Sequence, residues 1–334
     1  MTRSRTGLVL GVLAIAAVVL ALWPRHANQP DPARLPMPAS MGPAVAQRGS
    51  PNAPTAGDRS PAAKGGRPSL NPSSLVNRGA PLPPPGQPLT QIYDQLKQQV
   101  AHGDARAACR LGFEINRCAQ LPVLRSVPRM FQQASQRYAP GTPQYENARR
   151  VQQQAERNLQ SAEGACAGFT VDDPSISWDY TLAAALAGNR EAIFSALSFP
   201  PGLNASRPEN TLEGWTQWRQ YAPQLMEAGI ALGDPRVFRI AARNYLAPSF
   251  GTRIVDADPA RSLALLSALL PVTAPSYRPV IERDISAIGA SQEQQEDARR
   301  IASSLPRLTN IPEGGVDWAR GMAPDSNGKQ CEEP

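Results

Sequence analysis

Signals that end one helix and begin the next recur along this sequence, and they constrain its fold more than any other feature. In "GIALGDPRVFRIAARNY" (229–245), Gly233 can end a helix in the left-handed conformation, and Asp234-Pro235 can begin another. From Thr90 onward no long stretch alternates between apolar and polar residues, as a half-buried strand does. The sequence therefore predicts an all-α fold of roughly ten helices over residues 90–334.

Further residues mark the ends of the predicted helices. Six side chains are placed to accept hydrogen bonds from the first free N–H groups of a helix: Thr90, Asp104, Thr142, Asp234, Asp258 and Ser291. Gln294 follows Ser291 by three positions, which is the pattern of a capping box. Four glycines are placed to end helices: Gly103, Gly188, Gly233 and Gly289.

Two longer segments carry narrow apolar stripes and are predicted to pack on each other. The first stripe has spacings of 3 and 4: Leu124, Val127, Phe131, Ala134 and Tyr138. The second has the same spacings: Ala148, Val151, Ala155, Leu159 and Ala162. Such stripes on otherwise polar helices, joined by the tight connection "APGTP" (139–143), predict an antiparallel helical hairpin over residues 119–163.

The N-terminus predicts export. Arg3 and Arg5 precede the apolar run "GLVLGVLAIAAVVLALW" (7–23), whose 17 residues are the lower limit for a membrane span. The run ends in a poor cleavage site, so residues 1–23 are predicted to be an uncleaved signal-anchor in the inner membrane, with a cleaved signal peptide as the alternative. The basic residues before the run predict that the folded part lies in the periplasm, or that the protein is secreted if the segment is cleaved.

Residues 24–89 contain 16 prolines in 66 positions and are predicted to form a disordered linker, either a spacer or a docking site for a partner. This linker has a net charge of +5, and residues 1–23 add +2. Because the whole chain carries +6, residues 90–334 carry a net charge of −1. A nucleic-acid-binding domain has a basic patch on its folded part, so no nucleic-acid partner is predicted.

Four cysteines in an exported chain indicate disulfides. Cys118 and Cys166 flank the predicted hairpin, where the chain returns close to its start, and closing this loop stabilises the fold by roughly 4 kcal/mol. Four cysteines allow three pairings. We favour Cys118–Cys166 with Cys109–Cys331, while the pairings through Cys109–Cys118 and Cys109–Cys166 stay open. The cysteine spacing and the lack of nearby histidines argue against a zinc site.

Two other segments of the sequence resemble the turn between helices at Gly233, which we call a corner. "VAHGDARAACRL" (100–111) and "ALAGNREAIFSAL" (185–197) align with "IALGDPRVFRIAA" (230–242), and the three glycines are 85 and 45 residues apart. This sequence pattern, which is clearest at 228–270, resembles the tetratricopeptide-like repeats of the Sel-like class. The resemblance implies an irregular, α-solenoid-like series of helix pairs that offers a concave surface to a protein or peptide and has no active site.

Two groups of side chains are candidates for partner binding. The first group lies on the helix after Gly233, at spacings of 3 and 4: Arg236, Arg239 and Arg243. These arginines either contact an acidic segment of a partner or form a solvated helix face. The other lies at spacings of 3 and either lines a recognition groove or packs in the core: Trp215, Trp218 and Tyr221. Signatures of hydrolases, zinc proteases and nucleotide-binding loops are absent, so we predict no catalysis, no cofactor and no metal.

Anchor, linker and repeat together predict a membrane-tethered, exported helical-repeat protein that binds a protein or peptide partner in the cell envelope as a scaffold or adaptor. The alternative is a folding helper for an exported enzyme, because lipase-specific foldases share the layout of anchor, Pro-rich linker and helical domain. A cell-wall-acting enzyme is a third hypothesis.

Overall fold

The computed structural model is built from α-helices throughout its described residues, which are 74–76, 79–201, 208–247, 254–309, 311, 316 and 329–332. The chain divides into two units, Met1–Arg67 and Pro68–Pro334, and all the described residues belong to the second. The predicted anchor and residues 24–73 of the predicted linker lie outside the described residues.

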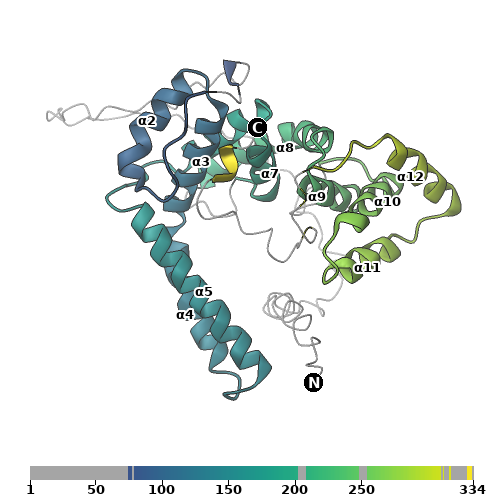
Figure 1. Cartoon of the computed structure of the whole chain (residues 1–334), viewed down its shortest axis with the longest axis horizontal. Coiled ribbons are helices and arrows are strands. Elements are labelled where there is room, and N and C mark those ends of the chain that lie inside the picture. The colour runs from purple at the N-terminus through teal and green to yellow at the C-terminus, as the bar shows by residue number, and fades with distance from the viewer. Residues whose placement is uncertain are drawn as a thin grey trace, which may run out of the picture. The chain divides into compact units, whose positions relative to one another are not determined.

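Eleven α-helices follow one another in this part of the chain (Figure 1). They are α2 (Leu89–Ala101), α3 (Ala105–Ala119), α4 (Leu121–Ser135), α5 (Pro143–Ala165), α6 (Ser175–Leu186), α7 (Arg190–Ser198), α8 (Pro208–Ala231), α9 (Pro235–Leu246), α10 (Pro259–Leu269), α11 (Arg278–Ile288) and α12 (Gln292–Ser304). Two short 3-10 helices are η2 (Leu270–Val272) and η3 (Lys329–Glu332). The described residues form no β-strand, so the prediction of an all-α fold is confirmed.

Side-chain caps determine where most of these helices begin. Five predicted caps accept hydrogen bonds from N–H groups of the first turn: Asp104, Thr142, Asp234, Asp258 and Ser291. The predicted capping box between Ser291 and Gln294 is also present. The prediction for Thr90 is wrong, because α2 begins at Leu89, directly after Pro88, so Thr90 already lies inside the helix. The Thr90 hydroxyl instead donates to the carbonyl of Ala167 at 3.4 Å.

The three corners found in the sequence have the same backbone geometry. They are Gly103-Asp104, Gly188-Asn189 and Gly233-Asp234. Each glycine has a positive φ (89°, 84° and 66°), and the residue after it caps the next helix. Each glycine N–H donates to the carbonyl three residues earlier, and the following N–H donates to the carbonyl five residues earlier. These bonds end the first helix and begin the second, so that α2 packs on α3, α6 on α7 and α8 on α9.

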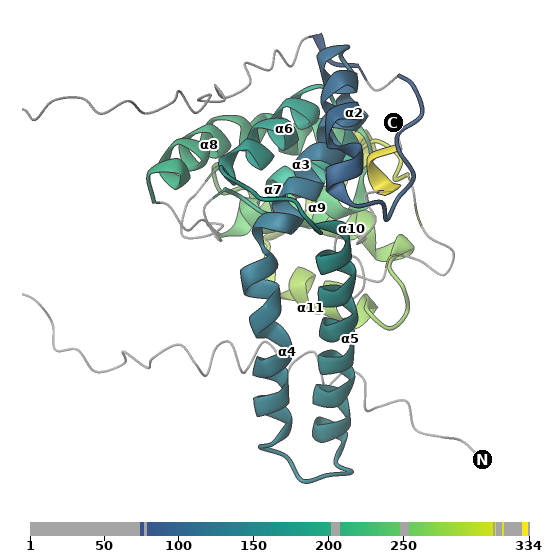
Figure 2. The ribbon, with the colours of Figure 1, turned by 90° about the vertical axis from the view of Figure 1, so that its left-hand side faces the viewer.

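The predicted hairpin consists of α4 and α5, which lie side by side in Figure 2. Because α4 ends at Ser135, Tyr138 lies in the connection and not on the α4 stripe. A disulfide between Cys118 and Cys166 closes the base of the hairpin. The helices on either side of it, α3 and α6, pack directly on each other. The hairpin is therefore an insertion between two neighbouring helices of the series.

The insertion explains the unequal spacing of the corners. Gly103 and Gly188 are 85 residues apart, and 48 of these positions separate Cys118 from Cys166. The remaining 37 positions are comparable to the 45 between Gly188 and Gly233. Helices outside the hairpin pack on their neighbours in sequence from α2 and α3 through α6, α7, α8 and α9 to α10, and α10 packs on both α11 and α12.

The packed part of the chain also includes residues before α2. Leu75 is buried in the core, within the segment that the sequence assigns to the linker. The N–H of Val76 donates to the Gly103 carbonyl at 2.8 Å, and the Ala105 N–H donates to the Val76 carbonyl at 2.9 Å. The first corner is therefore covered by an extended piece of the chain.

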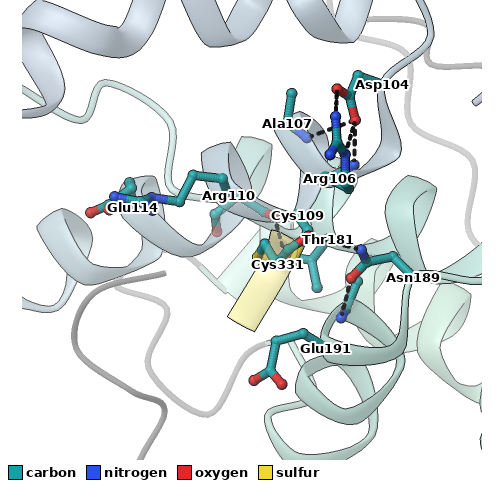
Figure 3. Close-up of a disulfide and its surroundings, with 12 residues drawn as sticks. Asp104, Arg106, Ala107, Cys109, Arg110, Glu114, Thr181, Asn189, Glu191 and Cys331 are labelled. Carbon is teal, nitrogen blue, oxygen red and sulfur yellow. Dashed lines mark hydrogen bonds and ion pairs between the residues drawn. A yellow bond between two sulfur atoms is a disulfide. The ribbon is translucent and has the colours of Figure 1, made fainter. Parts of the chain in front are cut away.

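The chain after α12 returns to earlier helices. The N–H of Thr309 donates to the Gly233 carbonyl at 3.0 Å, and the N–H of Val316 donates to the Val272 carbonyl at 2.8 Å. A disulfide then joins Cys331 to Cys109 in α3 (Figure 3). Together with the hairpin bond, this is the pairing that the sequence analysis favours.

Substitution at Gly233 is expected to lower the free energy of unfolding, because backbone atoms of another segment occupy the place of a side chain there. A Cβ there would lie 2.2 Å from the carbonyl oxygen of Arg307, whereas at Gly188 no described atom lies within 4 Å. Both glycines have positive φ, so Gly188→Ala is expected to cost about 1 kcal/mol. Gly233→Ala is expected to cost about 3 kcal/mol, because the segment at Arg307 must also move. Urea unfolding of both variants measures the difference, and equal costs contradict the docking of this segment.

Candidate functional site

Arg236, the first predicted binding residue, is held between helices. Its guanidinium donates to Glu191 Oε2 at 2.6 Å and to both carboxylate oxygens of Asp234 at 3.1 and 2.8 Å. It also lies over the ring of Phe194, 4.2 Å from the ring centre. Burial lowers the pKa of Arg236, but the hydrogen bond to Asp234 and the charge of Glu191 together raise it above that of free arginine. This side chain links α9 to α7, so it is not free to bind an acidic partner.

The other two predicted arginines have different environments. Arg239 is 8% exposed, lies 4.8 Å from the ring centre of Tyr277 and donates to the Tyr277 hydroxyl. Burial lowers the pKa of Arg239. Arg243 alone is exposed. The predicted arginine stripe is therefore not a solvent-facing surface, because its first two members pack against carboxylates and an aromatic ring from other parts of the chain.

The predicted aromatic group belongs to the core. Trp218 is 1% exposed, and its indole N–H donates to the carbonyl of Ala196 at 3.1 Å. Trp215 stacks on Trp218 with ring centres 4.9 Å apart, and Tyr221 packs against the same core. The core-packing alternative accounts for this group, and Trp218 is not available to a partner.

Paired substitutions distinguish a structural arginine from a binding one. Arg236→Ala removes the guanidinium that pairs with the carboxylates of Asp234 and Glu191, which are 2% and 8% exposed. We expect it to lower the free energy of unfolding by about 3 kcal/mol. The exposed control Arg243→Ala is expected to change it by less than about 0.5 kcal/mol. Thermal unfolding followed by circular dichroism tests this, and an unchanged melting temperature for Arg236→Ala contradicts the structural role.

A buried ion cluster in α3 was not predicted from the sequence. The Arg110 Nε donates to Glu114 Oε1 at 2.8 Å, and Arg117 pairs with the other oxygen of Glu114 (Figure 3 shows the first pair). Arg110 and Glu114 are 0% and 1% exposed, and burial lowers the pKa of Arg117. The spacings of 4 and 3 are visible in the sequence, but they do not distinguish a buried cluster from a solvated helix face.

The hairpin exposes apolar side chains. Of the eight large apolar side chains that are exposed in the described residues, three lie in or next to it: Val123, Met130 and Tyr138. Val123 and Met130 are 51% and 56% exposed and lie seven residues apart on one face of α4. Val127, between them, is half-buried. Two helices alone cannot cover an apolar stripe on all sides, so this surface stays open to a further element.

The two long sides of the hairpin differ in charge. One side is a groove of about 420 Å³ with the ion pair Arg125–Glu163 at 2.9 Å. The groove is lined by Arg125, Pro128, Arg129, Glu156, Leu159, Gln160 and Glu163. Helical periodicity places a different set of α4 residues on the opposite side, with no charged residue among them. We call this α4 set the neutral side: Val123, Ser126, Val127 and Met130. On α5 the same spacing places polar and basic residues beside it, and Arg157 Nη2 donates to Gln154 Oε1 there at 2.7 Å. The seven-residue spacing of Val123 and Met130 is the sequence signal that could have identified it.

In the described part of the chain no group of three or more His, Cys, Asp or Glu side chains could hold a metal ion. No helix there combines the length and the apolar character that a membrane crossing requires. Comparison of the chain with protein-family models, with curated proteins and with solved structures found no match.

Proposed function

We propose that this protein is a membrane-tethered, exported scaffold or adaptor that binds a protein partner in the cell envelope through the neutral side of its hairpin. Residues 1–23 anchor it in the inner membrane, and residues 24 to about 73 act as a linker that holds the helical part in the periplasm. The apolar run at 7–23 supports export. The two disulfides support it as well, because such bonds persist in oxidising compartments.

The exposure of Val123 and Met130 carries this proposal. Both side chains are more than half exposed on a side of α4 that carries no charged residue. Exposed apolar side chains that cluster on one surface are typical of protein–protein contacts. The arginine and tryptophan candidates support binding less well, because Arg236, Arg239 and Trp218 are occupied inside the fold.

The hairpin is also suited to binding because its base is fixed. The Cys118–Cys166 disulfide joins its two ends, and both helices contact α3. The ion pair Arg125–Glu163 connects the two helices on the groove side. A surface that is already ordered loses less conformational entropy when a partner binds. The proposal assigns no catalysis and no cofactor to the chain.

Recovery of a partner from crosslinked cells tests the proposal. A tagged full chain is compared with Met130→Glu, which puts a charge on the neutral side, and with Gln132→Glu, a matched control at an exposed α4 position off this side. We expect the wild type and Gln132→Glu to recover the same protein, and Met130→Glu to recover about tenfold less or none. Equal recovery by both variants, or no reproducible partner for the wild type, contradicts the proposal.

A further inference from the structure

We propose that the corner at Gly188 binds an extended segment of a partner protein through backbone hydrogen bonds. The corners at Gly103 and Gly233 bind two segments of this chain in that way, and the three corners share one backbone geometry. The segment that fits has leucine followed by valine or threonine. The site lies in the series of helix pairs and not in the hairpin, so it is a second surface beside the one in the proposed function.

The first corner holds an extended segment in a defined register. The carbonyl oxygen of Ser74 lies against Gly103, 2.8 Å from the place that a Cβ would take. Leu75 follows and is buried in the core. Val76 then pairs with the corner itself, because its N–H donates to the Gly103 carbonyl at 2.8 Å and its carbonyl accepts from the Ala105 N–H at 2.9 Å.

The third corner holds a distant segment in the same register. The carbonyl oxygen of Arg307 lies against Gly233, Leu308 packs on the core, and the N–H of Thr309 donates to the Gly233 carbonyl at 3.0 Å. Pro235 has no N–H to donate at this corner. The hydroxyl of Thr309 supplies the second bond instead, to the carbonyl of the residue before the glycine, at 3.0 Å.

The two bound segments also resemble each other in sequence. They read "SLVN" (74–77) and "RLTN" (307–310), which is leucine, a β-branched residue and asparagine in both cases. Leucine supplies apolar surface for burial, and a β-branched residue favours an extended backbone. Leu-Val-Asn and Leu-Thr-Asn occur nowhere else in the 334 residues, so this sequence offers no third copy for the middle corner. A partner protein is therefore the favoured source.

The middle corner presents the same backbone groups. In the described part of the chain no N–H donates to the Gly188 carbonyl, and no atom lies within 4 Å of the place of its Cβ. The side chain of Asn189 accepts from the Ala192 N–H. The N–H of Arg190, which corresponds to that of Ala105 in the first corner, has no acceptor among the described residues. One acceptor and one donor are thus placed as in the first corner.

The middle corner is also rigid. Asn189 is 0% exposed, and its amide donates to the carbonyl of Cys331 at 3.3 Å (both residues are labelled in Figure 3). The disulfide from Cys331 to Cys109 ties this contact to α3. A peptide that binds here meets backbone that is already ordered, and glycine lets the peptide carbonyl approach closely. Recognition by main-chain hydrogen bonds, with a side chain for specificity, is a common mode of peptide binding.

The experiment measures binding of a fluorescein-labelled peptide, PSSLVNRG (residues 72–79), to the purified full chain by fluorescence polarisation. We expect saturable binding to the wild type. Gly188→Ala puts a Cβ where the peptide carbonyl has to lie, and it should weaken binding about tenfold or more. The matched control is Gly289→Ala, whose glycine ends α11 with a φ of 60° and has no described atom within 4 Å of its Cβ position. This control should bind like the wild type.

A second peptide tests the role of leucine. Aspartate in place of leucine puts a charge where the occupied corners bury an apolar side chain, so it should weaken binding about tenfold. A peptide with p-benzoylphenylalanine in place of valine should attach to residues 186–191 in light. Attachment at 102–106 or 232–236 shows that the peptide displaces one of the chain's own segments, and it overturns the proposal.

The remaining outcomes are equally decisive. Equal binding by the wild type and Gly188→Ala, or no saturable binding by the wild type, overturns the proposal. Melting temperatures of Gly188→Ala and Gly289→Ala, expected to match each other, show that lost binding is not misfolding. Met130→Glu in the hairpin should bind the peptide like the wild type, so a failure at this corner leaves the proposed function of the hairpin standing.

Discussion

Removal of the Cys109–Cys331 disulfide is expected to lower the free energy of unfolding by about 5 kcal/mol, because the bond closes a loop of 222 residues. It also holds the chain after α12 against α3 and α7, where the Asn189 side chain donates to the Cys331 carbonyl at 3.3 Å. The variant is Cys109→Ala with Cys331→Ala, and urea unfolding measures the change.

A second pair of substitutions provides the control. Cys118→Ala with Cys166→Ala opens a loop of 48 residues and is expected to cost about 4 kcal/mol. Hydrogen exchange should distinguish the two variants by location. Loss of the first bond should speed exchange at 305–309 and 329–332, and loss of the second should speed it in α4 and α5. A cost below about 1 kcal/mol for the first variant contradicts the role of this bond.

Glu114→Gln is expected to lower the free energy of unfolding by about 3–5 kcal/mol, since it removes one partner of a buried ion pair. Glu114 is 1% exposed and lies between Arg110 and Arg117. Among the described residues the terminal nitrogens of Arg110 have no hydrogen-bond partner, so the carboxylate of Glu114 supplies its counter-charge. Glutamine has the same shape, and the change therefore removes charge without opening a cavity.

The matched control is Asp297→Asn, which removes one partner of the exposed ion pair between Arg300 and Asp297 in α12. Exposed pairs contribute little, so this change is expected to cost less than about 0.5 kcal/mol. Thermal unfolding of both variants makes the comparison. Similar melting temperatures for the two variants contradict the account of α3 as a helix with a buried ion cluster.

Local signals made much of the fold predictable. Asp104, Asp234 and Ser291 cap helices as expected because a cap depends on residues within one turn. The hairpin was predictable because its two stripes are adjacent in sequence and face each other. Its geometry brings Cys118 and Cys166 together, which is why this disulfide could also be predicted.

The candidate site was less predictable because burial depends on distant residues. The spacing of Arg236 and Arg239 identifies a helix face but not what covers it. Glu191, 45 residues before Arg236, and Tyr277, 38 residues after Arg239, cover that face. Leu75 packs in the core, but it lies in a Pro-rich segment whose apolar residues show no helical or strand periodicity. The neutral side was missed because the apolar stripes of α4 and α5 identify only the residues that face the partner helix.

Photo-crosslinking along α4 tests whether the neutral side of the hairpin contacts protein. p-Benzoylphenylalanine is placed in turn at each exposed position from Pro122 to Gln133 of the full chain in intact cells. We expect products that recur with the helical period, strongest at positions 123 and 130 and absent at 125, 129 and 132. Products that are strongest at 125 and 129, equal at all positions or absent throughout contradict this contact.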